Sequence, residues 1–242
     1  MNHIKIGDTV VDYELIFTNR KKTIGISIDR NKKLKVRAPR GLSESDVRAS
    51  LYRKSKWILI NLERMDNNLQ DELLRKFVSG EKFLLKGRSY GLEVLESEND
   101  VSPSLIFNNA KFVATVPKNI SRSEYREHIR PLFIDYYSQK AEQVINERID
   151  VYLSHFAETP SAVKVNEFKS KWGSCSGTNQ LKFNWKIVMA DLSIIDYLVV
   201  HELCHMIHKN HSRDYWDSVE AILPDHKERR KWLRLNGARL NI

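Results

Sequence analysis

Four of the eight histidines lie in one short segment, residues 201–211. The segment contains the pattern His-Glu-x-x-His, formed by His201, Glu202 and His205. Residues i and i+4 lie about 6 Å apart along one face of a helix, so both imidazoles can converge on one zinc ion. Glu202 flanks that face and can reach a zinc-bound water, taking its proton as the water attacks a carbonyl or phosphoryl centre. The pattern predicts a zinc-dependent hydrolase with Glu202 as the catalytic base.

A catalytic zinc usually has three protein ligands, so the pattern needs a third. His208 shares the helix face, but seven residues of helix rise about 10 Å, which is too far from the first histidine. His211 is better placed, because the two residues before it can turn the chain back toward the metal. A glutamate on a later helix, Glu220 or Glu228, is the alternative third ligand.

The histidine segment lies in the helical half of the predicted fold. Apolar periodicity predicts a helix from Ile194 to about His208, with Ser193 as its N-cap and Asp196 three residues later. Three short strands are expected before this helix and two helices after it. The strands cover 163–168, 171–175 and 181–185, and the helices cover 212–222 and 225–236.

The upstream half alternates between apolar and polar residues, as short strands do. Ser43 and Asp46 form a capping box, in which a side-chain oxygen accepts hydrogen bonds from free amides at a helix start. The helix that begins there is expected to reach about Leu69. The predicted strands are 10–17, 23–28, 34–38, 82–85, 90–95, 105–107 and 111–116.

A second capping box, Ser121 with Glu124, begins a long helix that Pro131 should kink or split. This change from strands to helices predicts two domains. We expect an α+β protein with a β-rich N-terminal domain over 1–118 and a helical domain over 119–242. A short sheet precedes the metal-binding helix in the second domain.

The composition excludes several classes of protein. The chain has 242 residues, of which 41% are hydrophobic and 29% charged, unlike a disordered protein. No apolar run approaches the roughly 18 residues of a membrane-spanning helix. The N-terminus lacks the features of a secretory signal, and two cysteines make no disulfide framework. We therefore expect a cytoplasmic protein with no membrane partner, in which Cys175 and Cys204 stay reduced.

The net charge of +9 is concentrated in one stretch. Residues 20–64 contain 14 basic and 4 acidic residues, and the rest of the chain is nearly neutral. One interpretation of this basic stretch is a surface that binds nucleic acid or a nucleotide phosphate. The other is a set of solvated strand and helix faces, because no zinc-finger spacing or phosphate-binding glycine loop accompanies the charge.

Several runs of sequence resemble the YgjP-like metallopeptidase-domain proteins, whose metal site is similar to that of SprT-like proteases. The run before the metal helix is Lys-Trp-Gly-Ser-Cys-Ser, and the helix itself carries Asp-Tyr-Leu-Val-Val-His-Glu-Leu-Cys-His. The resemblance covers nearly the whole chain. Its runs are 38–41, 57–58, 80–81, 87–90, 171–176, 181–185, 196–205, 210–212, 215–216 and 223–225.

The resemblance implies a zincin-like catalytic domain that cleaves a peptide bond in a peptide or protein substrate. It implies zinc on His201, His205 and His211, with Glu202 as the general base. In zincins an edge strand binds extended substrate by strand addition, and 181–185 is the strand expected to do so.

Residues flanking the metal helix are candidates for substrate contact: Trp172, Asn184 and Tyr215. The alternative is that the aromatic ones are core anchors under the helix. Tyr215 or Arg213 is also a candidate to stabilise a developing oxyanion.

Two other functions fit the same residues. The first is a nucleotide phosphohydrolase, similar to a nucleoside triphosphate pyrophosphatase, because a zinc-activated water attacks phosphorus as well as carbon. The other is a nucleic-acid-binding or adaptor module in which the metal is structural and the basic stretch holds the nucleic acid.

Overall fold

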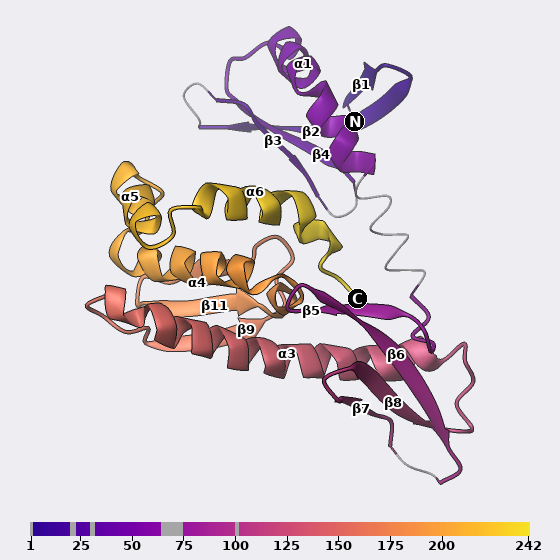
Figure 1. Cartoon of the computed structure of the whole chain (residues 1–242). Helices are drawn as coiled ribbons and strands as arrows, with labels where there is room; N and C mark the ends of the chain where they lie inside the picture. The colour runs from indigo at the N-terminus through magenta and orange to yellow at the C-terminus, as the bar shows by residue number, and fades with distance from the viewer. Residues whose placement is uncertain (1, 20–22, 30–31, 64–74, 100–101) are drawn as a thin grey trace. The chain divides into compact units, whose positions relative to one another are not determined.

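The computed structural model describes residues 2–19, 23–29, 32–63, 75–99 and 102–242 (Figure 1). The chain divides into two compact units, Met1–Leu73 and Leu74–Ile242. Sheets dominate the N-terminal half and helices the C-terminal half, which confirms the predicted α+β class. The domain boundary predicted at 118–119 falls inside the second unit. Among the described residues, no helix is both long and apolar enough to cross a membrane.

The first unit is a four-stranded sheet with a helix on one face. The outer strands pair antiparallel with their neighbours, and the two central strands run parallel. The helix, α1 (Glu44–Arg53), begins at the predicted capping box and buries Val47 and Leu51. The strand order is β1 (Asn2–Ile6), β2 (Thr9–Thr18), β4 (Leu34–Pro39) and β3 (Gly25–Ile28).

The helix predicted from Ser43 to Leu69 is interrupted. The α1 helix ends at Arg53, because the amide of Lys54 bonds to the carbonyls of Leu51 and Tyr52 instead of continuing the regular pattern. A further helical segment covers 55–63, and the rest of the predicted helix lies outside the described residues. The prediction of one continuous helix is therefore wrong.

The second unit contains two sheets and the remaining helices. A four-stranded sheet repeats the topology of the first unit, and a three-stranded sheet follows it. The four-stranded order is β5 (Lys82–Leu85), β6 (Arg88–Ser97), β8 (Lys111–Pro117) and β7 (Ser104–Phe107), and the three-stranded order is β10 (Gly173–Cys175), β11 (Gln180–Asn184) and β9 (Ala162–Asn166). The helices are α3 (Tyr125–Tyr152), α4 (Leu192–Ile207), α5 (Arg213–Ile222) and α6 (His226–Asn236).

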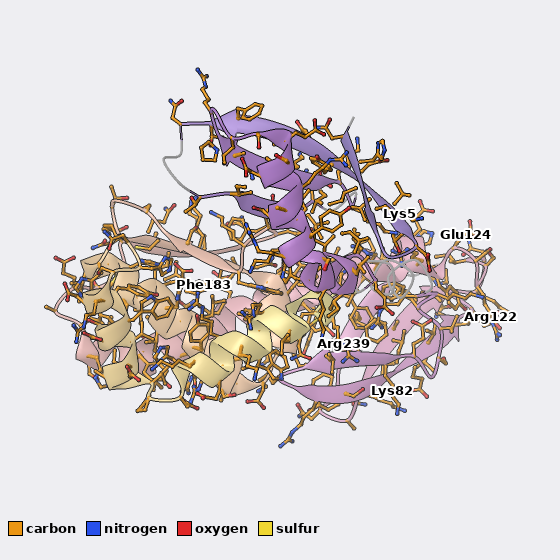
Figure 2. The ribbon with its side chains drawn as sticks, turned by 90° about the horizontal axis from the view of Figure 1, so that it is seen from above. Lys5, Lys82, Arg122, Glu124, Phe183 and Arg239 are labelled. Carbon is orange, nitrogen blue, oxygen red and sulfur yellow. The ribbon has the colours of Figure 1, made fainter. Side chains whose placement is uncertain are left out.

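The chain contains an internal structural repeat. In both four-stranded sheets the first two strands form a hairpin, the second pairs parallel with the fourth, and the third lies at the edge. The sequence also repeats at the end of each fourth strand. The ten-residue segments 39–48 and 117–126 share the pattern Pro-basic-x-aliphatic-Ser-x-Ser-acidic-x-Arg. In both copies the first serine hydroxyl donates to the acid, Asp46 or Glu124, at 2.5 Å (Figure 2 labels Glu124). The repeat is a four-strand unit followed by a helix.

The α3 helix ties the second repeat to the rest of its unit. Pro131 does not split this helix, because residues on both sides of it are held in the core. Phe133 stacks on Phe83 of β5 with 4.1 Å between ring centroids, and the Tyr137 hydroxyl donates to the Leu84 carbonyl at 2.8 Å. These contacts explain why the second repeat and the helical half form one unit.

The α4 helix, which carries His201 and His205, buries 11 of its 16 residues. Its N-cap is Asp191, whose carboxylate accepts from the Ser193 amide at 2.9 Å, so the predicted cap at Ser193 was two residues too late. Asp196 forms a largely buried ion pair with Arg148 of α3 at 2.5 Å, which joins the two helices.

The strand predicted at the sheet edge lies in the middle of the three-stranded sheet. β11 pairs antiparallel with β10 on one side and parallel with β9 on the other. Phe183 of β11 is accordingly fully buried (Figure 2). The edges of this sheet are β10 and β9, and the turn after Cys175 folds β10 onto one side of β11.

Candidate metal centre

Three imidazoles meet at the end of α4. The Nε2 atom of His211 lies 3.2 Å from Nε2 of His205 and 3.3 Å from Nε2 of His201. Nitrogen ligands at the corners of a tetrahedron around zinc lie about 3.3 Å apart. Both distances from His211 therefore match the spacing of zinc ligands, and the donor atoms of the three histidines all lie within 4.8 Å of one another.

The local fold explains how three residues from one segment converge. α4 places His201 and His205 one turn apart on the same face. The helix ends at Ile207, and its C-cap His208 is extended, so the chain turns before Ser212 caps α5. This turn returns His211 to the other two.

The other predicted ligand candidates lie apart from this cluster. His208 places its Nε2 3.2 Å from the Ser218 hydroxyl. Glu220 pairs with Lys227 at 2.8 Å. Neither glutamate alternative, Glu220 or Glu228, belongs to the group of donor atoms that the described residues bring together.

Hydrogen bonds set which nitrogen of each helix histidine is free. The Nδ1 atom of His205 lies 2.9 Å from the His208 carbonyl, which can only accept, so Nδ1 carries the proton. The Tyr215 hydroxyl donates to the His201 carbonyl at 3.1 Å and lies 2.5 Å from His201 Nδ1, from which it accepts. Both imidazoles therefore keep an Nε2 lone pair for a metal.

Burial favours the neutral form of His201 and His211. It lowers the pKa of His201 to about 3, with a further contribution from the neighbouring His205 and His211. Burial also lowers the pKa of His211. Since a metal binds only the unprotonated nitrogen, the site is ready to bind near neutral pH.

Tyr215 is fully buried within the histidine cluster. Its ring stacks on His205 with 4.5 Å between centroids, and its hydroxyl faces the nitrogen of His201 that points away from the cluster centre. These contacts are those of a residue that orients ligands. Arg213, the other oxyanion candidate, is exposed and pairs with Asp217 at 3.6 Å.

Glu202 lies beside the triad in a dry environment. Its side chain is 3% exposed, and burial raises the pKa of its carboxyl to about 8. Its Oε2 atom has no hydrogen-bond partner among the described residues. An unpaired buried carboxylate is costly, and such groups are typical of functional sites.

Gly173 of β10 is the residue that sequence reasoning missed. A Cβ atom at this position would overlap the Oε1 atom of Glu202. The absence of a side chain lets the carboxylate pack directly against the edge strand. A glycine inside a predicted strand signals a close approach of this kind, but its partner is not visible from the sequence.

Trp172 and Asn184 hold the loop that leads into β10. The Asn184 amide donates to two carbonyls in the segment 168–171, and its backbone amide bonds to the Trp172 carbonyl at 2.7 Å. The indole of Trp172 packs so closely on Gly237 that a Cβ there would lie 2.9 Å away. The structure thus gives both predicted substrate residues contacts within the chain.

A triad of imidazoles beside a buried carboxylate is typical of metal-dependent hydrolases. The chain matches the family model described as YgjP-like, metallopeptidase domain, over residues 22–236. It therefore belongs to the YgjP-like metallopeptidase-domain family, which confirms the resemblance seen in the sequence.

Two solved structures of metallopeptidase zymogens are similar to part of the chain. Abylysin from Pyrococcus abyssi is 20% identical, with a TM-score of 0.33 over 39% of this chain and 94% of that one. Jannalysin from Methanocaldococcus jannaschii is 23% identical, with a TM-score of 0.31 over 37% of this chain and 89% of that one. No curated protein matches the chain.

Removal of the Tyr215 hydroxyl is expected to weaken metal binding. Tyr215→Phe leaves His201 Nδ1 without its acceptor, and loss of such an orienting partner typically costs about 10–100-fold in affinity. Competition with a chromophoric zinc chelator measures the change. Tyr197→Phe removes a buried hydroxyl one turn before His201 and should change affinity less than twofold. Equal affinities in the two variants would contradict the role of Tyr215.

The raised pKa of Glu202 predicts a pH-dependent stability of the metal-free protein. Between its ordinary value of 4.5 and about 8, the folded protein holds a proton that the unfolded chain has released. The stability from this group is therefore lost as pH rises through that window. The histidines of the unfolded chain titrate near pH 6.5 and act in the opposite direction, so the stability difference between the wild type and Glu202→Gln isolates the contribution of Glu202. From pH 6.5 to 8 this difference should fall by about 1–2 kcal/mol. Urea unfolding of the two chelator-treated proteins measures it.

Proposed function

We propose that the protein is a zinc-dependent peptidase in which His201, His205 and His211 hold zinc and Glu202 is the general base. The observation that carries the proposal is the buried, unpartnered Glu202 carboxylate next in the chain to a triad with zinc-like spacing. Membership of a metallopeptidase-domain family supports the peptide bond as the target. Zinc is the metal we propose because three imidazole nitrogens are a ligand set typical of catalytic zinc.

Each residue has a distinct task. Zinc, when bound, supplies a Lewis acid for carbonyl polarisation and water activation. Glu202 takes a proton from the attacking water and delivers it to the leaving amine. Tyr215 keeps His201 in the tautomer that binds metal.

The edge strand β10 is the element we expect to hold the substrate. An extended peptide can add to its outer edge through backbone hydrogen bonds. Because Gly173 has no side chain, the Glu202 carboxylate lies against this strand. A peptide aligned on β10 would then present its backbone next to the base. Trp172 and Asn184 support this strand from behind rather than contact the peptide.

The nucleotide, nucleic-acid and cytoplasmic hypotheses stay predictions. The basic stretch 20–64 and the histidine triad belong to different compact units. The positive charge of the stretch therefore does not support a phosphate-containing substrate for the triad. A peptide is therefore the substrate class that we propose for this site.

The proposal is tested by activity and metal content on the same samples. Glu202→Gln is expected to retain about one zinc per chain and to lose peptide hydrolysis by about 10²–10⁴-fold, the usual contribution of a general base. The measurement combines elemental analysis with a panel of unfolded proteins, peptides and nucleoside triphosphates. Undiminished peptide hydrolysis in Glu202→Gln, or Glu202-dependent cleavage of nucleotides alone, would overturn it.

Gly173→Ala is expected to impair the same reaction without loss of metal. The added methyl group displaces the Glu202 carboxylate, so kcat should fall at least tenfold while zinc content is unchanged. Gly177→Ala is the matched control, because a Cβ there meets no atom within 4 Å. Equal kcat values for the two variants would show that the contact between Gly173 and Glu202 does not matter.

A further inference from the structure

The first unit carries an open groove between its helix and its edge strand. The groove encloses about 470 Å³, within the range of pockets that hold ligands. We name it the α1–β3 groove. Its lining residues are Thr23, Ile24, Ile26, Leu42, Asp46, Ala49, Ser50, Arg53 and Lys54.

One face of α1 forms a wall of this groove. The helix residues in the lining, from Asp46 to Lys54, recur at intervals of three and four and therefore share a face. Val47 and Leu51 lie beside this face and are fully buried in the core. On the strand side, Ile26 is only half-buried, whereas Val36, its partner on β4, is fully buried. Apolar surface is thus left uncovered along the edge strand.

The β3 strand is an edge with little protection. It is last in the strand order of its sheet, and no described strand pairs with its outer side. Proteins usually protect such edges with lysine, proline or a bulge. The strand itself reads Gly-Ile-Ser-Ile and has no charged residue or proline. Its backbone is suited to accept another strand.

The groove is positive at one end. Arg53 and Lys54 are exposed at the C-terminal end of α1. The carboxylate of Asp46, at the other end, accepts bonds from the Ser43 amide and hydroxyl and is held by the capping box. An acidic partner therefore meets two cations.

The second repeat differs at the same place. There α3 packs against the equivalent edge strand β7, with Tyr136 6.2 Å from Phe107 between ring centroids. The positions that align with Ala49 and Arg53 are Glu127 and Pro131, so the cation is absent. The groove and its charge are features of the first repeat alone.

We propose that the first unit binds an extended acidic polypeptide segment, which adds as a strand to the outer edge of β3. Every second side chain of the segment points into the α1–β3 groove. Apolar side chains of this set fill the groove, and acidic side chains of the same set, at one end, face Arg53 and Lys54. Binding at this site does not require the metal centre. The proposal is therefore independent of the proposed peptidase activity.

The test uses the full chain and fluorescein-labelled octapeptides whose four alternate, groove-facing positions hold two apolar residues (Val, Leu or Tyr) and two Glu, in either order, with Ser at the positions between. At least one peptide is expected to bind saturably by fluorescence anisotropy, and its counterpart with Lys in place of Glu at least tenfold more weakly. Amide hydrogen exchange should slow in Gly25–Ile28 when the peptide is bound. Binding should persist in Glu202→Gln and after chelation of metal.

Three variants locate the site. Arg53→Glu should weaken binding at least tenfold, and Ala49→Trp, which fills the groove from an exposed helix position, should abolish it. Lys56→Glu makes the same charge reversal outside the groove lining and should change affinity less than threefold. Circular dichroism checks that each variant is folded.

Several results would overturn the proposal. These are the absence of saturable binding by any of the peptides, equal binding of the lysine peptides, or equal losses in Arg53→Glu and Lys56→Glu. Slower amide exchange elsewhere in the chain, with no change in Gly25–Ile28, would also overturn it. If single-stranded RNA, rather than the peptides, protected β3, the partner would be a nucleic acid. A change of mass in sedimentation with Ala49→Trp would show that a second copy of the chain occupies the groove.

Discussion

The hydrogen bond between Tyr215 and His201 is the constraint on which the candidate metal centre depends. A neutral imidazole has one proton, and if that proton were on Nε2 the nitrogen could not bind a metal. Tyr215 holds the proton on Nδ1, and its ring stacks on His205. Because Tyr215 comes from α5, whose start also delivers His211, the packing of α5 on α4 sets all three ligands at once.

The same packing stabilises an unfavourable carboxylate. Glu202 is buried without a partner for Oε2, which costs a few kcal/mol. Each fully buried apolar side chain contributes about 1.5–3 kcal/mol, and α4 buries Val199, Val200 and Leu203 completely. The burial of these side chains offsets the cost of burying the Glu202 carboxylate, and the missing side chain of Gly173 leaves space for it.

Local patterns predicted more than long-range ones. The spacing of His201, Glu202 and His205 is a property of a single helix, and the turn to His211 follows directly, so the sequence predicted the convergence. The role of Tyr215 depends on where another helix crosses α4, and the contact of Gly173 depends on strand order. The parallel pairing of β9 with β11 likewise joins residues on either side of a long loop. Such non-local contacts leave no periodic signal, which is why 181–185 was placed at the edge.

The internal repeat explains why exposed cations lie at the end of α1 and not at the matching place in α3. The Pro-to-Arg motif and its serine–acid hydrogen bonds persist in both copies, because they fix the turn between the last strand and the helix. The helix faces diverge: α3 continues for 28 residues within the core, whereas α1 ends after 10 with cations at its end. Because α3 packs against the core, the face that it turns to the edge strand β7 cannot carry exposed arginines. The α1 helix does not have this task, so its C-terminal end can keep Arg53 and Lys54 exposed in the lining of the α1–β3 groove.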